Sequence, residues 1–134
     1  MNDTSLIRGL TIRQPWASLI AFGSKTVENR TWSTRWTGIL LIHAAKTADQ
    51  HVSRDLADAV WGDVRGAVIA VARLKGCHAD DGRCTPWAEP GAFHWVLADI
   101  RPLKQPVLCT GRLGLWTPAP GVLAAVGAQL GTAG

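Results

Sequence analysis

Two almost continuously apolar segments constrain the fold most: ILLIHAA at residues 39–45 and AVIAVARL at residues 67–74. A strand with one solvated face alternates apolar and polar residues, so the continuous run of the first segment predicts a β-strand covered on both faces. The second segment is rich in β-branched side chains, and we expect it to lie at the centre of a sheet. His43 is the one polar residue of the first segment.

The segment before these strands predicts a strand followed by a short helix. The strand, residues 6–12, ends before Pro15, because proline has no backbone N–H to pair. Pro15 suits the first turn of a helix, in which apolar residues recur at helical spacing until Gly23 ends it. The same reasoning predicts strands over residues 26–32, 93–101 and 112–116, a helix over 49–61, a surface loop over 76–91, and a helix or ordered tail over 122–130.

Five or six short strands with two short helices near the front do not alternate as βαβ units do. A chain of 134 residues fits one domain with one core, so we predict a single domain over residues 1–134. The predicted fold class is α+β, mainly β: a small antiparallel or mixed β-barrel with short helices packed at its rim.

Composition and cysteine spacing indicate which cellular compartment and which cofactors to expect. The chain has no apolar run near the roughly 20 residues of a membrane span, and its start lacks the pattern of a signal peptide, so we expect a cytoplasmic protein without a membrane partner. An odd number of cysteines, three, favours reduced thiols. The spacing of Cys77, His78, Cys84 and His94 lacks the paired two-residue intervals of structural zinc sites, so we predict neither a metal nor another cofactor.

Positive charge is concentrated in one third of the chain. Residues 8–46 hold a single carboxylate, Glu28, against six cations: Arg8, Arg13, Lys25, Arg30, Arg35 and Lys46. A one-sided basic region attracts phosphate backbones through counterion release. The charge distribution therefore favours a polyanionic partner.

The segment GSKTVENR, residues 23–30, places Lys25, Glu28 and Arg30 within eight positions. On a strand Glu28 and Arg30 point the same way, because side chains alternate along an extended backbone. This G-x-K-x-x-E-x-R pattern, preceded by Gln14-Pro15-Trp16 and followed by GILLIH, resembles the ASCH family of the PUA-like superfamily. The later segments FHWVLADIRPL and GRLGLW resemble the closing strands of such proteins.

The resemblance implies a β-barrel with a cleft between the barrel and the first helix, floored by the motif, that binds RNA, single-stranded nucleic acid or a modified nucleoside. A site for a base needs a flat ring for stacking and polar groups at the base edge. The predicted nucleotide-binding residues are Gln14, Trp16, Lys25, Glu28, Arg30, Trp32, Trp36 and His43, with Arg13, Arg35 and Lys46 contacting phosphates.

The same residues admit a structural interpretation. Tryptophan is commonly a core residue, and an ion-pair network of Lys25, Glu28 and Arg30 would fix the strand to the helix. His43 likewise fits either a core position or the cleft.

An alternative function is a small hydrolase that acts on N4-acetylcytidine-type nucleosides or on RNA. In a bacterial subgroup of the family that this chain resembles, a lysine, a threonine and a glutamate hydrolyse the amide of N4-acetylcytidine. The threonine of that subgroup lies three positions after the lysine. Here Glu28 occupies that position and Thr26 follows Lys25 directly, so the catalytic candidates are Lys25, Thr26 and Glu28. A third alternative is a protein-interaction module that uses the loop at residues 76–91 and surface tryptophans.

Overall fold

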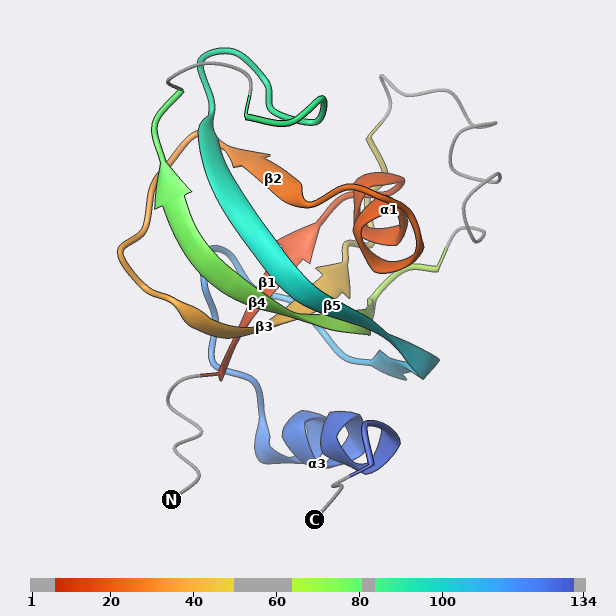
Figure 1. The fold of residues 1–134 in the computed structure, drawn as a ribbon. Coiled ribbons are helices and arrows are strands. Elements are labelled where there is room, and N and C mark those ends of the chain that lie inside the picture. The colour runs from red at the N-terminus through yellow and green to blue at the C-terminus, as the bar shows by residue number, and fades with distance from the viewer. Residues whose placement is uncertain (1–6, 50–63, 81–83, 132–134) are drawn as a thin grey trace.

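The strands of the computed structural model, which describes residues 7–49, 64–80 and 84–131, form one five-stranded sheet that curls into a half-barrel (Figure 1). The order across the sheet is β1-β3-β4-β5-β2, with β1 and β3 parallel and the other neighbours antiparallel. This confirms the predicted α+β, mainly β, fold with short helices at the rim. The elements are β1 (Ile7–Ile12), α1 (Trp16–Phe22), β2 (Val27–Arg30), β3 (Gly38–Ala44), β4 (Ala67–His78), β5 (Phe93–Leu108) and α3 (Pro120–Gln129).

Most predicted strands are present, and β4 lies at the centre of the sheet as expected. β4 runs on to His78, so the prediction that a loop begins at residue 76 is wrong. The prediction of a strand over residues 112–116 is also wrong: only an isolated bridge joins Trp116 to Gly9, and Gly114 breaks the extended backbone with a φ of 69°. The helix predicted over residues 49–61 lies almost wholly outside the described residues.

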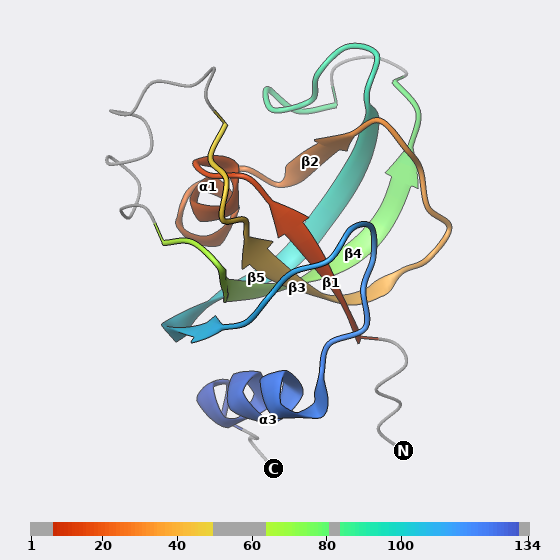
Figure 2. The ribbon, with the colours of Figure 1, turned by 180° about the vertical axis from the view of Figure 1, so that it is seen from behind.

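Irregular pairing explains why the sheet curls. The β4–β5 register shifts at three places along the ladder, and β3–β4 shifts once, between Ile42 and His43. Near the middle of β5, Asp99 adopts a φ of 51°, which ordinary strand residues do not. An extra residue on one strand of a pair bends that strand and increases its twist. The long β4–β5 pair therefore bends around the interior instead of lying flat (Figure 2).

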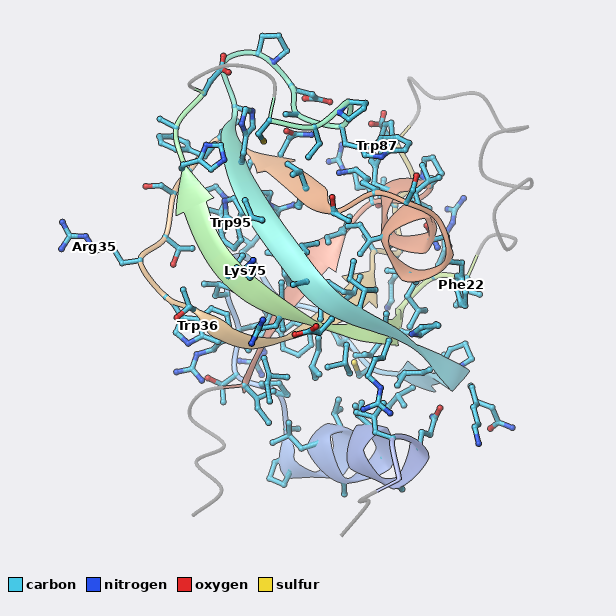
Figure 3. All side chains as sticks on the ribbon, viewed as in Figure 1. Phe22, Arg35, Trp36, Lys75, Trp87 and Trp95 are labelled. Atoms are coloured by element: carbon cyan, nitrogen blue, oxygen red, sulfur yellow. The ribbon has the colours of Figure 1, made fainter. Side chains whose placement is uncertain are left out.

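Each face of the sheet packs against a helix. The concave face packs around the fully buried Trp95 (Figure 3) and against α1, in a cluster that includes Leu10, Leu40 and Ile42. The convex face meets α3 in a second cluster: Leu41, Val68, Val71, Leu103 and Val126. Coverage on both faces confirms the interpretation of the first apolar segment, residues 39–45. No helix among the described residues is long and apolar enough to cross a membrane.

Trp116 covers the outer edge of β1. Its backbone exchanges two hydrogen bonds with Gly9, of 2.8 and 3.0 Å. Its indole lies directly on the same residue, since a Cβ added at Gly9 would stand 2.4 Å from two ring carbons. An uncovered edge strand is a template for unwanted pairing, so this contact protects the sheet.

We predict that Gly9→Ala destabilises the fold by about 1–3 kcal/mol, because the new methyl group forces the indole off β1. Urea denaturation of the wild type and the variant measures this difference. The control is Gly76→Ala, whose added Cβ would meet nothing within 4 Å. Equal stability of Gly9→Ala and the wild type would show that the indole does not rest on this edge.

Candidate functional site

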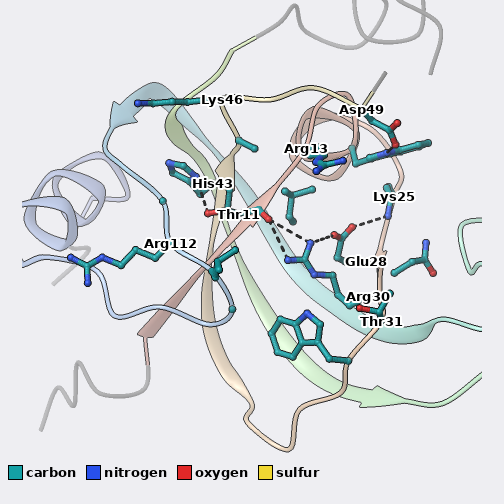
Figure 4. Close-up of a pocket in the computed structure, with 18 of the residues that line it drawn as sticks. Thr11, Arg13, Lys25, Glu28, Arg30, Thr31, His43, Lys46, Asp49 and Arg112 are labelled. Atoms are coloured by element: carbon teal, nitrogen blue, oxygen red, sulfur yellow. Dashed lines mark hydrogen bonds and ion pairs between the residues drawn. The ribbon is translucent and has the colours of Figure 1, made fainter. Parts of the chain in front are cut away.

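A cavity of about 820 Å³ lies between the outer strands β1 and β2, the start of α1 and the segment after β5 (Figure 4). Its volume is within the range of about 300–1,000 Å³ that is common for small-molecule sites. The lining residues are Thr11, Ile12, Arg13, Trp16, Lys25, Glu28, Asn29, Arg30, Thr31, Trp32, His43, Ala45, Lys46, Asp49, Glu89, Thr110, Gly111, Arg112, Leu113 and Gly114.

A buried ion-pair network forms one wall of the cavity. The two carboxylate oxygens of Glu28 accept from Lys25 Nζ at 3.3 Å and from Arg30 Nη1 at 3.0 Å. Glu28 and Arg30 point the same way, as alternation along β2 predicted. Lys25 also donates to the backbone oxygen of Val27. Unpaired buried charges are strongly destabilising, so the carboxylate stabilises and orients both cations. Glu28 therefore positions the two cations, and the network keeps a net positive charge.

Arg30 also joins the two outer strands of the sheet. Its Nη1 and Nη2 donate to the Thr11 carbonyl oxygen at 3.5 and 3.4 Å. β1 and β2 stand at opposite ends of the strand order, so these side-chain bonds connect the two edge strands of the sheet. The guanidinium, whose side chain is 22% exposed, remains accessible from the cavity.

Two indole rings line the cavity, and each is held in place. Trp16 donates its Nε1–H to Asp49 Oδ2 at 2.9 Å, and Lys25 Nζ stands 5.7 Å from its ring centre. Trp32 packs edge-on against Trp95 with 4.7 Å between ring centroids, and Arg30 Cζ lies 5.8 Å from its ring. Cations at these distances attract aromatic faces. Contacts within the protein therefore fix the orientation of both rings.

His43 and Thr11, opposite each other on β3 and β1, form a directed hydrogen-bond chain. His43 Nε2 lies 2.8 Å from the Cys109 carbonyl oxygen, which only accepts, so Nε2 carries the proton. In the neutral ring Nδ1 is then the acceptor, and the Thr11 hydroxyl donates to it at 3.2 Å. Trp116 Nε1 donates to the same hydroxyl at 3.2 Å. The Thr11 hydroxyl proton is therefore directed at a ring nitrogen.

Burial keeps this histidine neutral. Desolvation lowers the pKa of His43 from its ordinary value of 6.5, the nearby Lys46 acts in the same direction, and the bond to Cys109 opposes them. A neutral imidazole with one lone pair directed at a hydroxyl has the form of a general base beside a nucleophile.

Gly111 permits this arrangement. A Cβ there would stand 2.3 Å from Thr11 Oγ1 and 2.8 Å from His43 Nδ1, closer than any side chain allows. The glycine lets the segment after β5 close against both residues. It also brings Arg112 to the cavity.

Eight of the predicted site residues line the cavity: Arg13, Trp16, Lys25, Glu28, Arg30, Trp32, His43 and Lys46. Four do not. Thr26 is exposed, Arg35 extends away from the sheet (Figure 3), and Trp36 packs against the main core. Gln14 is buried and donates to Ser18 Oγ and to the Val64 oxygen, both at 2.8 Å, so it anchors the start of α1.

Sequence reasoning missed several lining residues, among them Thr11, Asp49, Glu89 and Arg112. Glu89 reaches the cavity because the side chain of Asn29 holds its loop. Asn29 Nδ2 donates to the Trp87 carbonyl oxygen at 2.8 Å, and Asn29 Oδ1 accepts from the Glu89 N–H at 2.9 Å. The glycines around Arg112 were the one available signal, since they mark a close backbone approach.

The charge of the lining favours an anion. Five cations face three carboxylates, which leaves a net charge of +2 with His43 neutral: Arg13, Lys25, Arg30, Lys46 and Arg112 against Glu28, Asp49 and Glu89. A second cavity of about 640 Å³ shares Trp16, Lys25, Asn29 and Glu89 with the first and adds Trp87. The two cavities therefore form one extended aromatic surface, on which the cations belong to the first cavity and the second adds the carboxylate of Asp80.

These features define a small β-barrel domain with a basic cavity between its first helix and its outer strands. The sequence model of the ASCH domain matches residues 10–106, and the chain belongs to the ASCH domain family. No curated protein matches the chain.

Solved structures of an ASCH protein from Zymomonas mobilis share the fold. The chain is 15% identical to that protein, with a TM-score of 0.57 over 91% of this chain and 93% of the other. Two point mutants of the same protein give TM-scores of 0.56 at the same identity, over 89% of this chain and 92% and 94% of theirs. At this identity the similarity concerns the fold alone.

The lowered pKa of His43 predicts a pH-dependent stability. The ring takes up a proton near pH 6.5 when unfolded but only at lower pH when folded, so its stabilising contribution is full above 6.5 and is lost as the pH falls. The free energy of unfolding should fall by at most about 1.4 kcal/mol per pH unit within that window. Denaturant titrations between about pH 7 and 5 should show a smaller slope for His43→Gln. Identical slopes in the two proteins would contradict a lowered pKa.

Proposed function

We propose that this domain binds RNA or another single-stranded nucleic acid, with one base or modified nucleotide in the cavity. The observation that carries the proposal is the position of two fixed indoles, Trp16 and Trp32, within a lining of net charge +2. Stacking on aromatic side chains contributes about 1–3 kcal/mol per base in single-strand binders.

The polar groups divide into two sets. Lys25 and Arg30 are held by Glu28 and suit the carbonyl edge of a base, because their donors are fixed within the wall. Arg13, Lys46 and Arg112 are exposed at the cavity and suit phosphates. The adjoining cavity offers the Trp87 ring for stacking of a neighbouring base, while the phosphates contact the first cavity, because Asp80 and Glu89 line the second. A cavity this open and basic fits a strand better than an isolated uncharged nucleoside.

Binding should weaken steeply with salt. Removing a cation that neutralises one phosphate should reduce the slope of log affinity against log salt by about 0.7 for a single strand. We predict this reduction for Lys46→Ala and for Arg112→Ala, measured by fluorescence anisotropy with short labelled RNA oligonucleotides. Trp32→Ala should weaken binding by about 1–3 kcal/mol with an unchanged salt slope.

The matched control is Lys104→Ala, which removes an exposed cation of β5 that does not line the cavity. Its salt slope and affinity should equal those of the wild type. Binding that is absent, insensitive to salt, or weakened as much by Lys104→Ala as by Lys46→Ala would refute the proposed site.

A second candidate function, hydrolysis of an acylated nucleoside, rests on the Thr11–His43 chain. In this reaction Thr11 Oγ1 attacks the acyl carbon while its proton passes to His43 Nδ1, and the imidazolium then protonates the departing amine. Water hydrolyses the resulting threonyl ester, which releases the acid and restores the hydroxyl. Thr26, the nucleophile suggested by the sequence, is exposed and outside the cavity lining.

If the domain is such a hydrolase, it should convert N4-acetylcytidine to cytidine and acetate. Thr11→Val should abolish turnover, because it removes the hydroxyl but keeps the shape, whereas Thr26→Val should leave turnover unchanged. Chromatography of the nucleosides, with RNA as a parallel substrate, measures both. No turnover by the wild type, or full turnover by Thr11→Val, would eliminate this mechanism.

A further inference from the structure

Three potential metal ligands meet at the far end of the β4–β5 pair. His78 ends β4, His94 lies directly opposite it on β5, and Cys84 comes from the loop between the strands. One ligand atom from each residue lies within 4.8 Å of the other two. Cross-strand partners share one face of a sheet, so the pairing of β4 with β5 fixes the two imidazoles side by side.

The spacing of these atoms is near that of a tetrahedral metal site. With bonds of about 2.0–2.1 Å to nitrogen and 2.3 Å to sulfur, a tetrahedral centre separates its nitrogen and sulfur ligands by about 3.6 Å. Cys84 Sγ and His94 Nδ1 are 3.9 Å apart. That separation is long for a hydrogen bond. The two atoms need to move inward only slightly to bind an ion between them.

A hydrogen bond orients the ring of His94 for coordination, and another sets the tautomer of His78. His94, fully buried, donates from Nε2 to the Glu89 carbonyl oxygen at 2.8 Å, which puts the lone pair of the neutral ring on Nδ1, the atom that faces Cys84. His78 donates from Nδ1 to the Ala79 carbonyl oxygen at 2.8 Å, which places its lone pair on Nε2. Metal-binding histidines characteristically donate their other N–H to a carbonyl or carboxylate in this way.

Although the spacing of these residues in the sequence predicted no metal, we propose from their position in the fold that His78, Cys84 and His94 bind a transition-metal ion of the Zn²⁺ class. Two imidazoles and a thiolate suit Zn²⁺ and exclude Mg²⁺ and Ca²⁺, which require oxygen ligands. Water completes the tetrahedron. Cys77 does not take part, because it packs against the main core on the opposite face of β4 from His78.

The bound ion clamps a loop that contributes to both cavities. Cys84 and Glu89 belong to this loop, whose other ties to the sheet include the two hydrogen bonds of Asn29. A metal at Cys84 fixes the loop at a second point and restrains Glu89 and Trp87. The site is thus a structural clamp beside the nucleotide surface, and its occupancy is independent of the proposed function.

Chelator-treated, reduced full-length protein should bind one Zn²⁺ per chain in a competition titration with a chromophoric chelator. Cys84→Ser should weaken binding roughly a hundredfold or more, because losing a direct ligand exceeds the 10–100-fold effect of losing its hydrogen-bonded support. Cys77→Ser, which alters the neighbouring strand position, should bind like the wild type. Retained affinity in Cys84→Ser, or equal losses in both variants, would overturn the proposal.

Two further measurements use the wild type, so their outcome does not depend on whether a variant folds. Co²⁺ in place of Zn²⁺ should give the thiolate-to-cobalt charge-transfer band and the visible absorption of a tetrahedral ion. Zn²⁺ should slow alkylation of Cys84 while leaving Cys77 and Cys109 unaffected, as followed by mass spectrometry of the labelled peptides. Absence of the thiolate band, or unchanged alkylation of Cys84, would show that these residues do not bind the metal.

Discussion

The buried carboxylate of Glu28 is the interaction on which the site depends. It stands between the ammonium of Lys25, in the segment that joins α1 to β2, and a guanidinium on the same strand, and both of its oxygens are engaged. Three charges in a poorly hydrated position are stable only when each has a partner with good geometry. The K-x-x-E-x-R spacing supplies that geometry locally, so six residues of sequence, 25–30, form the central wall of the cavity.

The cavity exists because the sheet curls without a backbone ladder between its outer strands. Register shifts bend β4 and β5, helices cover both faces, and the edge of β1 is occupied by Trp116 and by Arg30. The space beside that edge is lined by residues from five parts of the chain: 11–16, 25–32, 43–49, Glu89 and 110–114. Each contributes charged or aromatic groups, which is why a short domain can present five cations and two indoles at one surface.

Sequence reasoning succeeded where the determinant is local. Apolar continuity predicted the buried strands, and alternation placed Glu28 and Arg30 on one side of β2. It failed where contacts join distant segments. Gln14 bonds locally to Ser18, but its second acceptor is the oxygen of Val64, fifty positions away, and no local pattern signals that contact. The Thr11–His43 and His78–His94 pairs follow from strand register, which the one-dimensional pattern does not specify. For the same reason, loop residues such as Glu89 were not predicted as neighbours of the cavity.

The contact between Arg30 and the Thr11 oxygen has a consequence for ligand occupancy. The guanidinium of Arg30 holds β1 and β2 together, so the distance between these strands depends on what else binds its N–H groups. An anion that binds Arg30 breaks its contact with the Thr11 oxygen and lets β1 and β2 separate. A ligand that leaves this contact intact favours the arrangement in which the two strands are joined. Occupancy and barrel closure are then reciprocally linked, so ligands of different charge should select different widths of the same opening.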